Sequence, residues 1–314
     1  MAPKAGVIKR RSLEPVVRDT TMQPKAIAHP ADGRLFNGAS EQFVDTAKDA
    51  GIERSQSYAR LGKHGEHKAA CYAHATQFQR MRREIRQLRT WLGRVIRDVQ
   101  HKAQAMPEAL KTKLEIARRL HAQRREDKHK LYALHAPEVE CLAKGKARTP
   151  YEFGVKVSVA VTAKEGLVVG MRSMPGNLCD GHTVDRQLEQ VEILTDVRPK
   201  IAVVDRGYRG AHAACGTRLL VSHTRRLPRS LKKLFKRRQA IEPVIGHMKT
   251  DGLLNHDWLK GALGGAMHAL LCGAGYNLRM ILAHLRVLYC ALAARITLAI
   301  MLTTGATSPH RAPA

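Results

Sequence analysis

The sequence predicts an α/β fold in which a mixed β-sheet is flanked by helices. Three observations support this prediction: a β-branched stretch near the N-terminus, an alternating strand pair in the middle of the chain, and an apolar run that ends in an acid. Segments with helical periodicity lie between and after these strands. Because each segment has an apolar face to bury, helices packed on a sheet are the expected arrangement.

The first strand is predicted within residues 13–22, LEPVVRDTTM, whose β-branched residues lead to Asp19. Residues 26–61 mix helix-forming and turn residues. From about residue 67 to residue 134 the pattern becomes helical, with a second helix over residues 106–134. One helix of this block has an apolar face formed by Leu88, Trp91, Leu92, Val95, Ile96 and Val99.

The opposite face of that helix is strongly basic. It carries Arg80, Arg82, Arg83, Arg86, Arg89, Arg94 and Arg97. A row of charges of one sign is either a solvated surface or a contact surface for a polyanion, and the number of arginines favours contact with DNA.

Four more strands are predicted between residues 151 and 222. Residues 151–174 alternate as a hairpin with a turn at residues 164–166. Residues 200–205, KIAVVD, form a continuous apolar run that ends in Asp205, which is typical of a buried strand with a functional group at its carboxyl end. Residues 218–222 predict a further short strand.

Helices are predicted after the hairpin and through the C-terminal part of the chain. Asp180 or Thr183 can cap a helix that carries Leu188, Val191 and Leu194. A long basic helix is expected from residue 228 to residue 249. Residues 287–304 are apolar but contain Arg295, so they predict a buried or packing helix, with a membrane span as the alternative.

These elements divide the chain into four parts. They are the first strand of a core (1–25), a mainly helical basic insertion (26–145), the remainder of the core (146–260), and a helical C-terminal segment with a disordered tail (261–314).

Charge is the strongest feature of the composition. The 314 residues include 54 Lys and Arg against 27 Asp and Glu, a formal net charge of +27, which favours a nucleic-acid partner. Aromatic residues make up only 4%, so base stacking is not the expected main binding mode. The six cysteines show no Cys-x-x-Cys spacing, which argues against a zinc finger, and the N-terminus has no apolar core of signal-peptide length.

Three acids are candidates for metal-dependent chemistry on phosphodiesters. Such chemistry uses two Mg²⁺ ions about 4 Å apart, and Mg²⁺ needs only a few carboxylates because it keeps several waters. Asp19 ends VVRD, Asp205 ends IAVVD, and Glu242 lies in FKRRQAIEPVIGHMK. Each acid alone could equally be a surface ion-pair partner. The predicted order of elements, however, places all three at one end of one sheet.

The segment around Glu242 resembles the signature of DDE insertion-sequence transposases, Tyr-x2-Arg-x3-Glu-x6-Lys. Phe235, Arg238, Glu242 and Lys249 keep every spacing, with Phe in place of Tyr. The segments VVRDTTMQPKAIAHPADGRL and AVVDRGYRG resemble the first and second acidic motifs of the family. SQSYARLGK and PGNLCDGHT resemble the IS-five group. The resemblance covers about residues 11–280.

This resemblance implies an RNase H-like catalytic core that cleaves and joins insertion-sequence ends with two Mg²⁺ (or Mn²⁺) ions. Asp19 and Asp205 would share the ions, and Glu242 would complete the shell of the second. The residues expected to contact DNA are Arg238, Lys249, Arg209, Tyr208, His182 and Arg237.

The resemblance also implies partners and a location. We expect double-stranded DNA, as transposon ends and target, a homo-oligomer assembled on DNA, and a cytoplasmic, nucleoid-associated protein without membrane attachment. The family usually has a further helical region before the first acid, whereas 18 residues precede Asp19 here. The expectation is therefore a chain that lacks this region or has an N-terminal partner encoded upstream.

Two alternatives remain open at this point. An inactive transposase remnant that only binds DNA would have the same charge and would not cleave DNA with Mg²⁺ or Mn²⁺. An RNase H-like nuclease would cut DNA without producing joined strands. In addition, Arg18 stands beside Asp19 where a buried strand predicts an apolar residue.

Overall fold

The computed structural model describes residues 9–28, 31–103, 105–124, 126–143, 150–176, 178–211, 213, 216–221 and 228–305. Within these residues, six strands form one mixed sheet with the order β2-β3-β1-β5-β6, and β4 pairs with β3. The strands are β1 (Pro15–Pro24), β2 (Glu140–Ala143), β3 (Tyr151–Thr162), β4 (Val168–Met174), β5 (Ile201–Val204) and β6 (Arg218–Val221). The mixed α/β fold predicted from the sequence is confirmed.

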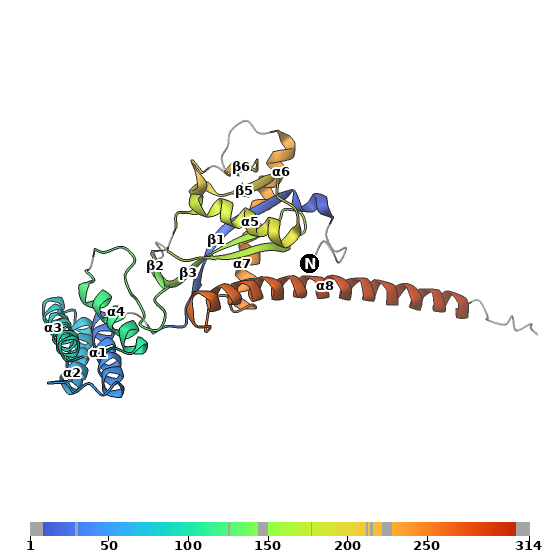
Figure 1. The fold of residues 1–314 in the computed structure, drawn as a ribbon. Helices are drawn as coiled ribbons and strands as arrows, with labels where there is room; N and C mark the ends of the chain where they lie inside the picture. The colour runs from blue at the N-terminus through green and yellow to red at the C-terminus, as the bar shows by residue number, and fades with distance from the viewer. Residues whose placement is uncertain are drawn as a thin grey trace, which may run out of the picture.

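Strand β1 lies in the centre of the sheet (Figure 1). It runs antiparallel to β3 over its whole length and parallel to β5 in its first half. The predicted hairpin is confirmed as β3–β4, and Gly166 in its turn has a φ of 74°, which glycine adopts without steric cost. Because side chains alternate along β1, Val17 faces one core and Val16 the other.

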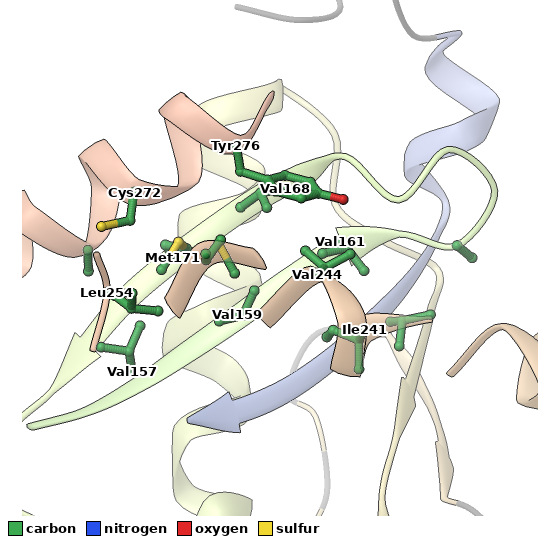
Figure 2. Packing of buried hydrophobic residues seen from close by; sticks show 14 of the residues in the cluster. Val157, Val159, Val161, Val168, Met171, Ile241, Val244, Leu254, Cys272 and Tyr276 are labelled. Carbon is green, nitrogen blue, oxygen red and sulfur yellow. The ribbon is translucent and has the colours of Figure 1, made fainter. Parts of the chain in front are cut away.

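Helices cover both faces of the sheet. The predicted helix is confirmed as α5 (Val184–Thr195), which buries Val184, Leu188 and Val191 on one face, whereas Leu194 is 46% exposed. The other face packs against α6 (Arg229–Arg238), α7 (Ile241–Thr250) and the first turns of α8 (Gly261–Gly305). Figure 2 shows this second core, in which Ile241 and Val244 of α7 and Tyr276 of α8 lie over Val159, Val161 and Val168.

The predicted long basic helix over residues 228–249 is wrong, because it is two helices that break at residues 239 and 240. The cause is Pro243. A proline has no N–H to donate to the carbonyl four residues earlier, and its ring clashes with that carbonyl, so a helix cannot continue through Gln239. In the first turn of a new helix the same proline is well tolerated.

Four helices form a separate group with their own core: α1 (Asp32–Asp49), α2 (Ala59–His74), α3 (Phe78–Lys102) and α4 (Glu108–Ala122). Figure 1 shows this group beside the sheet, beyond the far end of β1. The predicted apolar face of α3 is confirmed, since Leu88, Leu92 and Val99 are buried in this core. The predicted second helix is too long, because α4 ends at Ala122 rather than near residue 134.

Strand β2 was not predicted. It lies inside the range assigned to the helical insertion, yet it pairs antiparallel with the first residues of β3 and so belongs to the sheet. The predicted boundary between residues 145 and 146 lies outside the described residues.

Helix α8 continues far beyond the body of the protein (Figure 1). Its early residues Ala269, Cys272 and Tyr276 are buried against the sheet. The later part was predicted as a buried or packing helix, but Val287 is 66% exposed and Leu298 is 59% exposed. Among the described residues, α8 is the one helix with the length and apolar composition of a membrane span. The predicted disordered tail, residues 306–314, lies outside the described residues.

Candidate active site

Asp19 and Asp205 occupy equivalent positions on adjacent parallel strands. The register of β1 and β5 pairs Val16 with Ala202 and Val17 with Val203. Continuing that register by two residues places Asp19 beside Asp205, which follows the last residue of β5. Since side chains alternate along a strand, both acids point to the face that carries Val17 and Val203, the face covered by α7. The structure thus brings together two of the three predicted acids.

The carboxyl group of Asp19 has a perturbed pKa. Burial raises the pKa of Asp19 above its ordinary value, and the charges of Asp205 and Asp180 add to this increase. The Thr20 N–H, which donates to Asp19 Oδ1 at 2.8 Å, and the charge of Arg238 act in the opposite direction. A half-buried carboxylate facing like charges is stabilised by any cation that binds between them.

Asp205 also shapes the turn that follows it. Its carboxylate Oδ1 accepts a hydrogen bond from the Gly207 N–H at 2.8 Å and caps the short 3-10 helix η3 (Arg206–Tyr208). A Cβ atom at Gly207 would lie 3.1 Å from that oxygen and 3.3 Å from Asp180 Oδ2. Glycine at this position therefore lets two carboxylates approach the same point of the backbone.

Asp180 is a site residue that sequence reasoning missed. It lies in the 3-10 helix η2 (Asp180–Thr183), where the sequence suggested only a helix cap. Its Oδ1 accepts from Thr20 Oγ1 at 3.0 Å and is 3.2 Å from Lys156 Nζ. Thr183 rather than Asp180 stands at the N-cap of α5. The presence of an acid, Asp180, in the segment PGNLCDGHT could have indicated a site residue.

Glu242 does not join the aspartates. It lies in the first turn of α7, its side chain is 65% exposed, and its Oε1 is 3.6 Å from Arg238 Nη2. In the part of the chain that the structure describes, no three acidic, His or Cys side chains are close enough together to hold a metal ion. The predicted convergence of three carboxylates is therefore not found in this conformation. Glu242 is instead paired with Arg238, one turn earlier along the chain.

The donor set suits one divalent ion better than two. Asp19 and Asp205 offer hard carboxylate oxygens on one face, which fits Mg²⁺ with water completing its shell. Because burial and the neighbouring acids raise the pKa of Asp19, a cation bound there would favour its charged form. With Glu242 paired to Arg238, the residues present do not provide the third ligand expected for a second ion.

The residues predicted to contact DNA differ in their exposure to solvent. Arg209, His182 and Arg237 are exposed, and Lys249 is half-buried. Arg238 has only 20% of its side chain exposed and influences the pKa of Asp19. Arg237 lines a cavity of about 510 Å³ between the β3–β4 turn, α7 and α8, and neither Asp19 nor Asp205 lines this cavity.

Tyr208 is 1% exposed, so it is not available at the surface to contact DNA as predicted. Its ring instead lies under the guanidinium of Arg18, with Cζ 4.9 Å from the ring centroid. Burial raises the pKa of Tyr208 and lowers the pKa of Arg18.

Arg18 connects the segments that carry the acids. It is fully buried on β1, where its Nε donates to Ser158 Oγ of β3 at 3.0 Å and its Nη2 donates to Thr183 Oγ1 of η2. With the ring of Tyr208 in η3, this one side chain contacts the segments of both Asp180 and Asp205. Arg18, which stands where the sequence predicts an apolar residue, thus connects β1 to β3 and to the segments that carry Asp180 and Asp205.

Replacement of Asp19 by Asn is expected to raise the melting temperature of the metal-free protein by a few degrees near neutral pH. An acid whose pKa is raised on folding destabilises the fold. This penalty grows as pH rises from the ordinary carboxyl range through the raised pKa, and it is fully present above that value. Asn keeps an oxygen for the Thr20 N–H without the charge.

The measurement is thermal unfolding at several pH values, with Asp45→Asn, an exposed acid on α1, as the control. We expect Asp45→Asn to change little, and we expect Mg²⁺ to stabilise the parent protein but not Asp19→Asn. A lower melting temperature for Asp19→Asn near neutral pH would show that the charge of Asp19 does not destabilise the folded protein.

Comparison with known proteins adds one short similarity. The chain is 52% identical over 77 residues to a Rhizobium meliloti protein named "Uncharacterized protein ORF8 in nfe locus". The alignment covers 24% of this chain and 37% of that protein, so the chain spans little more than a third of its relative's length. No family model and no solved structure matches the chain.

Proposed function

We propose that this protein is a DNA transposase that cleaves and joins the ends of an insertion sequence, using divalent metal at Asp19 and Asp205. One observation carries the proposal: two aspartates occupy equivalent, adjacent positions on neighbouring parallel strands, in a chain with a net charge of +27. Metal-dependent cleavage of DNA uses carboxylates to hold a hard cation and a basic surface to bind the phosphates.

The order of elements supports an RNase H-like core. Strand β1, the hairpin β3–β4, helix α5 and strands β5 and β6 occur in the order predicted from the sequence pattern. The first acid lies on the central strand and the second at the end of its parallel neighbour, so their positions follow from the sheet itself.

The chain's own residues have distinct roles in this proposal. Asp19 and Asp205 would hold the metal, whose chemistry, when bound, is to neutralise charge on the attacking and leaving oxygens. The guanidinium of Arg238 is close enough to Asp19 to lower its pKa, and it is paired with Glu242. At this position it could bind a DNA phosphate. A phosphate at Arg238 would compete with Glu242, which would then be available to the aspartates.

The position of Glu242 also favours a second candidate function. If its pairing with Arg238 persists when DNA binds, the protein is a DNA-binding remnant of a transposase without strand-cleavage activity. Cleavage without joining would instead indicate an RNase H-like nuclease.

The test is incubation of the purified protein with a supercoiled plasmid that carries the element's two ends, with Mg²⁺ or Mn²⁺ and with a chelator as the control. Nicks or breaks at the ends together with joined strand-transfer products would support the proposal. Binding without cleavage would establish the remnant function, and cleavage without joined products would establish the nuclease.

The proposal extends to partners and location. We infer that the protein acts in the cytoplasm on double-stranded DNA of transposon ends and target, as a homo-oligomer assembled on that DNA. The basic charge of the chain supports the DNA partner.

A further inference from the structure

The helical group contains a cleft that the proposed chemistry does not use. It has a volume of about 990 Å³ and lies between the first half of α3, the start of α1 and the segment that follows α4. Its lining includes Arg82, Arg86, Arg89 and Arg124. None of its lining residues belongs to the sheet that carries the aspartates.

The arginines of α3 form a regular row along the cleft. Arg82, Arg86 and Arg89 are separated by four and three residues, so they lie on successive turns of one helix face. Arg82 and Arg86 are exposed, and neither forms an ion pair within the described residues, although Asp32 and Glu126 line the same cleft. Guanidinium groups without acidic partners remain available for an anionic ligand.

The surroundings of this row are positively charged as well. Burial together with the charges of Arg89 and Arg97 lowers the pKa of His121 on α4. Apolar side chains, among them Phe36, Met81 and Ile85, line the cleft together with these arginines.

We propose that this cleft binds the sugar–phosphate backbone of duplex DNA, at a second contact region separate from the two aspartates. The inference rests on the proposed function, because DNA is chosen over other polyanions as the substrate of that function. Fork-shaped guanidinium groups at regular intervals bind phosphates by paired hydrogen bonds, without reading the base sequence. The cleft would therefore hold DNA beside the ends on which the aspartates act.

The experiment compares two variants that remove the same charge. Arg82→Gln/Arg86→Gln removes the two unpaired arginines of the cleft, and Arg60→Gln/Arg118→Gln removes two exposed arginines outside it. Affinity for a short fluorescein-labelled DNA duplex of arbitrary sequence is measured by anisotropy over a salt titration. Circular dichroism and melting temperature check that both variants fold.

We expect the cleft variant to lose about tenfold or more in affinity at moderate salt. Its slope of log affinity against log salt should fall by about 2, since each phosphate contact contributes about 0.9. The control variant should lose much less of both. Equal losses in the two folded variants would overturn the proposal, because they would show that only net charge matters.

The outcome is separable from that of the proposed function. A cleft variant that matches its control, in a protein whose parent cleaves and joins ends, rejects the cleft and keeps the transposase. A selective loss of affinity in a protein that never cleaves DNA supports the cleft and the DNA-binding remnant. Tighter binding of an RNA duplex than of the DNA duplex by the parent protein would reject DNA as the occupant.

Discussion

Asp205→Asn is expected to reduce metal-dependent cleavage of insertion-sequence ends by about 10³-fold or more. Loss of one carboxylate from a pair removes the charge that holds a divalent ion, and about 4 kcal/mol of lost transition-state stabilisation corresponds to that factor. DNA affinity should stay the same or increase, because the variant removes a negative charge next to the bound DNA.

The measurement is the rate of end cleavage with Mg²⁺, with DNA affinity determined on the same preparation. A matched control is Asp196→Asn, at an exposed residue between α5 and β5 whose φ of 55° Asn also tolerates. Asp196→Asn should retain most of the activity. Comparable cleavage by Asp205→Asn and its control would remove Asp205 from the proposed site.

Glu242→Gln tests in the same cleavage assay the one predicted acid that does not lie beside Asp19 and Asp205. If DNA displaces Glu242 from Arg238, this variant should lose cleavage to a similar extent as Asp205→Asn. Full retention of cleavage would show that the aspartate pair suffices without Glu242.

Lys25→Met is expected to destabilise the protein by about 3–5 kcal/mol, the usual effect of removing one partner from a buried ion pair. Lys25 Nζ lies 2.9 Å from Asp257 Oδ2 and 3.2 Å from Glu138 Oε1, and it also donates to the carbonyl of Leu259. The Asp257 side chain is 2% exposed, so the variant leaves a buried charge without a counter-charge.

This cluster joins distant parts of the chain. Lys25 follows β1, Asp257 precedes α8, and Glu138 precedes β2. His268 of α8 lies 3.8 Å from Asp257 through its Nδ1. Loss of Lys25 should therefore loosen the start of α8 and the edge of the sheet together.

Chemical denaturation with Lys200→Met as the control tests this expectation. Lys200 is also paired with an acid, Glu14, at 2.9 Å, but its side chain is 72% exposed, so its removal should change stability by less than about 1 kcal/mol. Equal effects of the two variants would show that the buried cluster contributes no more than a surface ion pair.

Local pattern was sufficient for much of the fold. The hairpin β3–β4, the strand before Asp205 and the apolar face of α3 were predicted because alternation and helical spacing depend only on near neighbours. The break before Glu242 was also readable, because Pro243 cannot lie in the interior of a helix. Strand β2 was missed because four residues carry too little pattern without their partner β3.

The sequence by itself determined the basic charge and most of the order of elements, and it predicted Asp19 and Asp205 at the same end of one sheet. Only the tertiary structure decided the environment of each acid. Asp180 meets Thr20 across 160 positions of sequence, and Glu242 turns to Arg238. Ion pairs and hydrogen bonds act over a few ångströms, so their partners are fixed by packing and not by spacing along the chain.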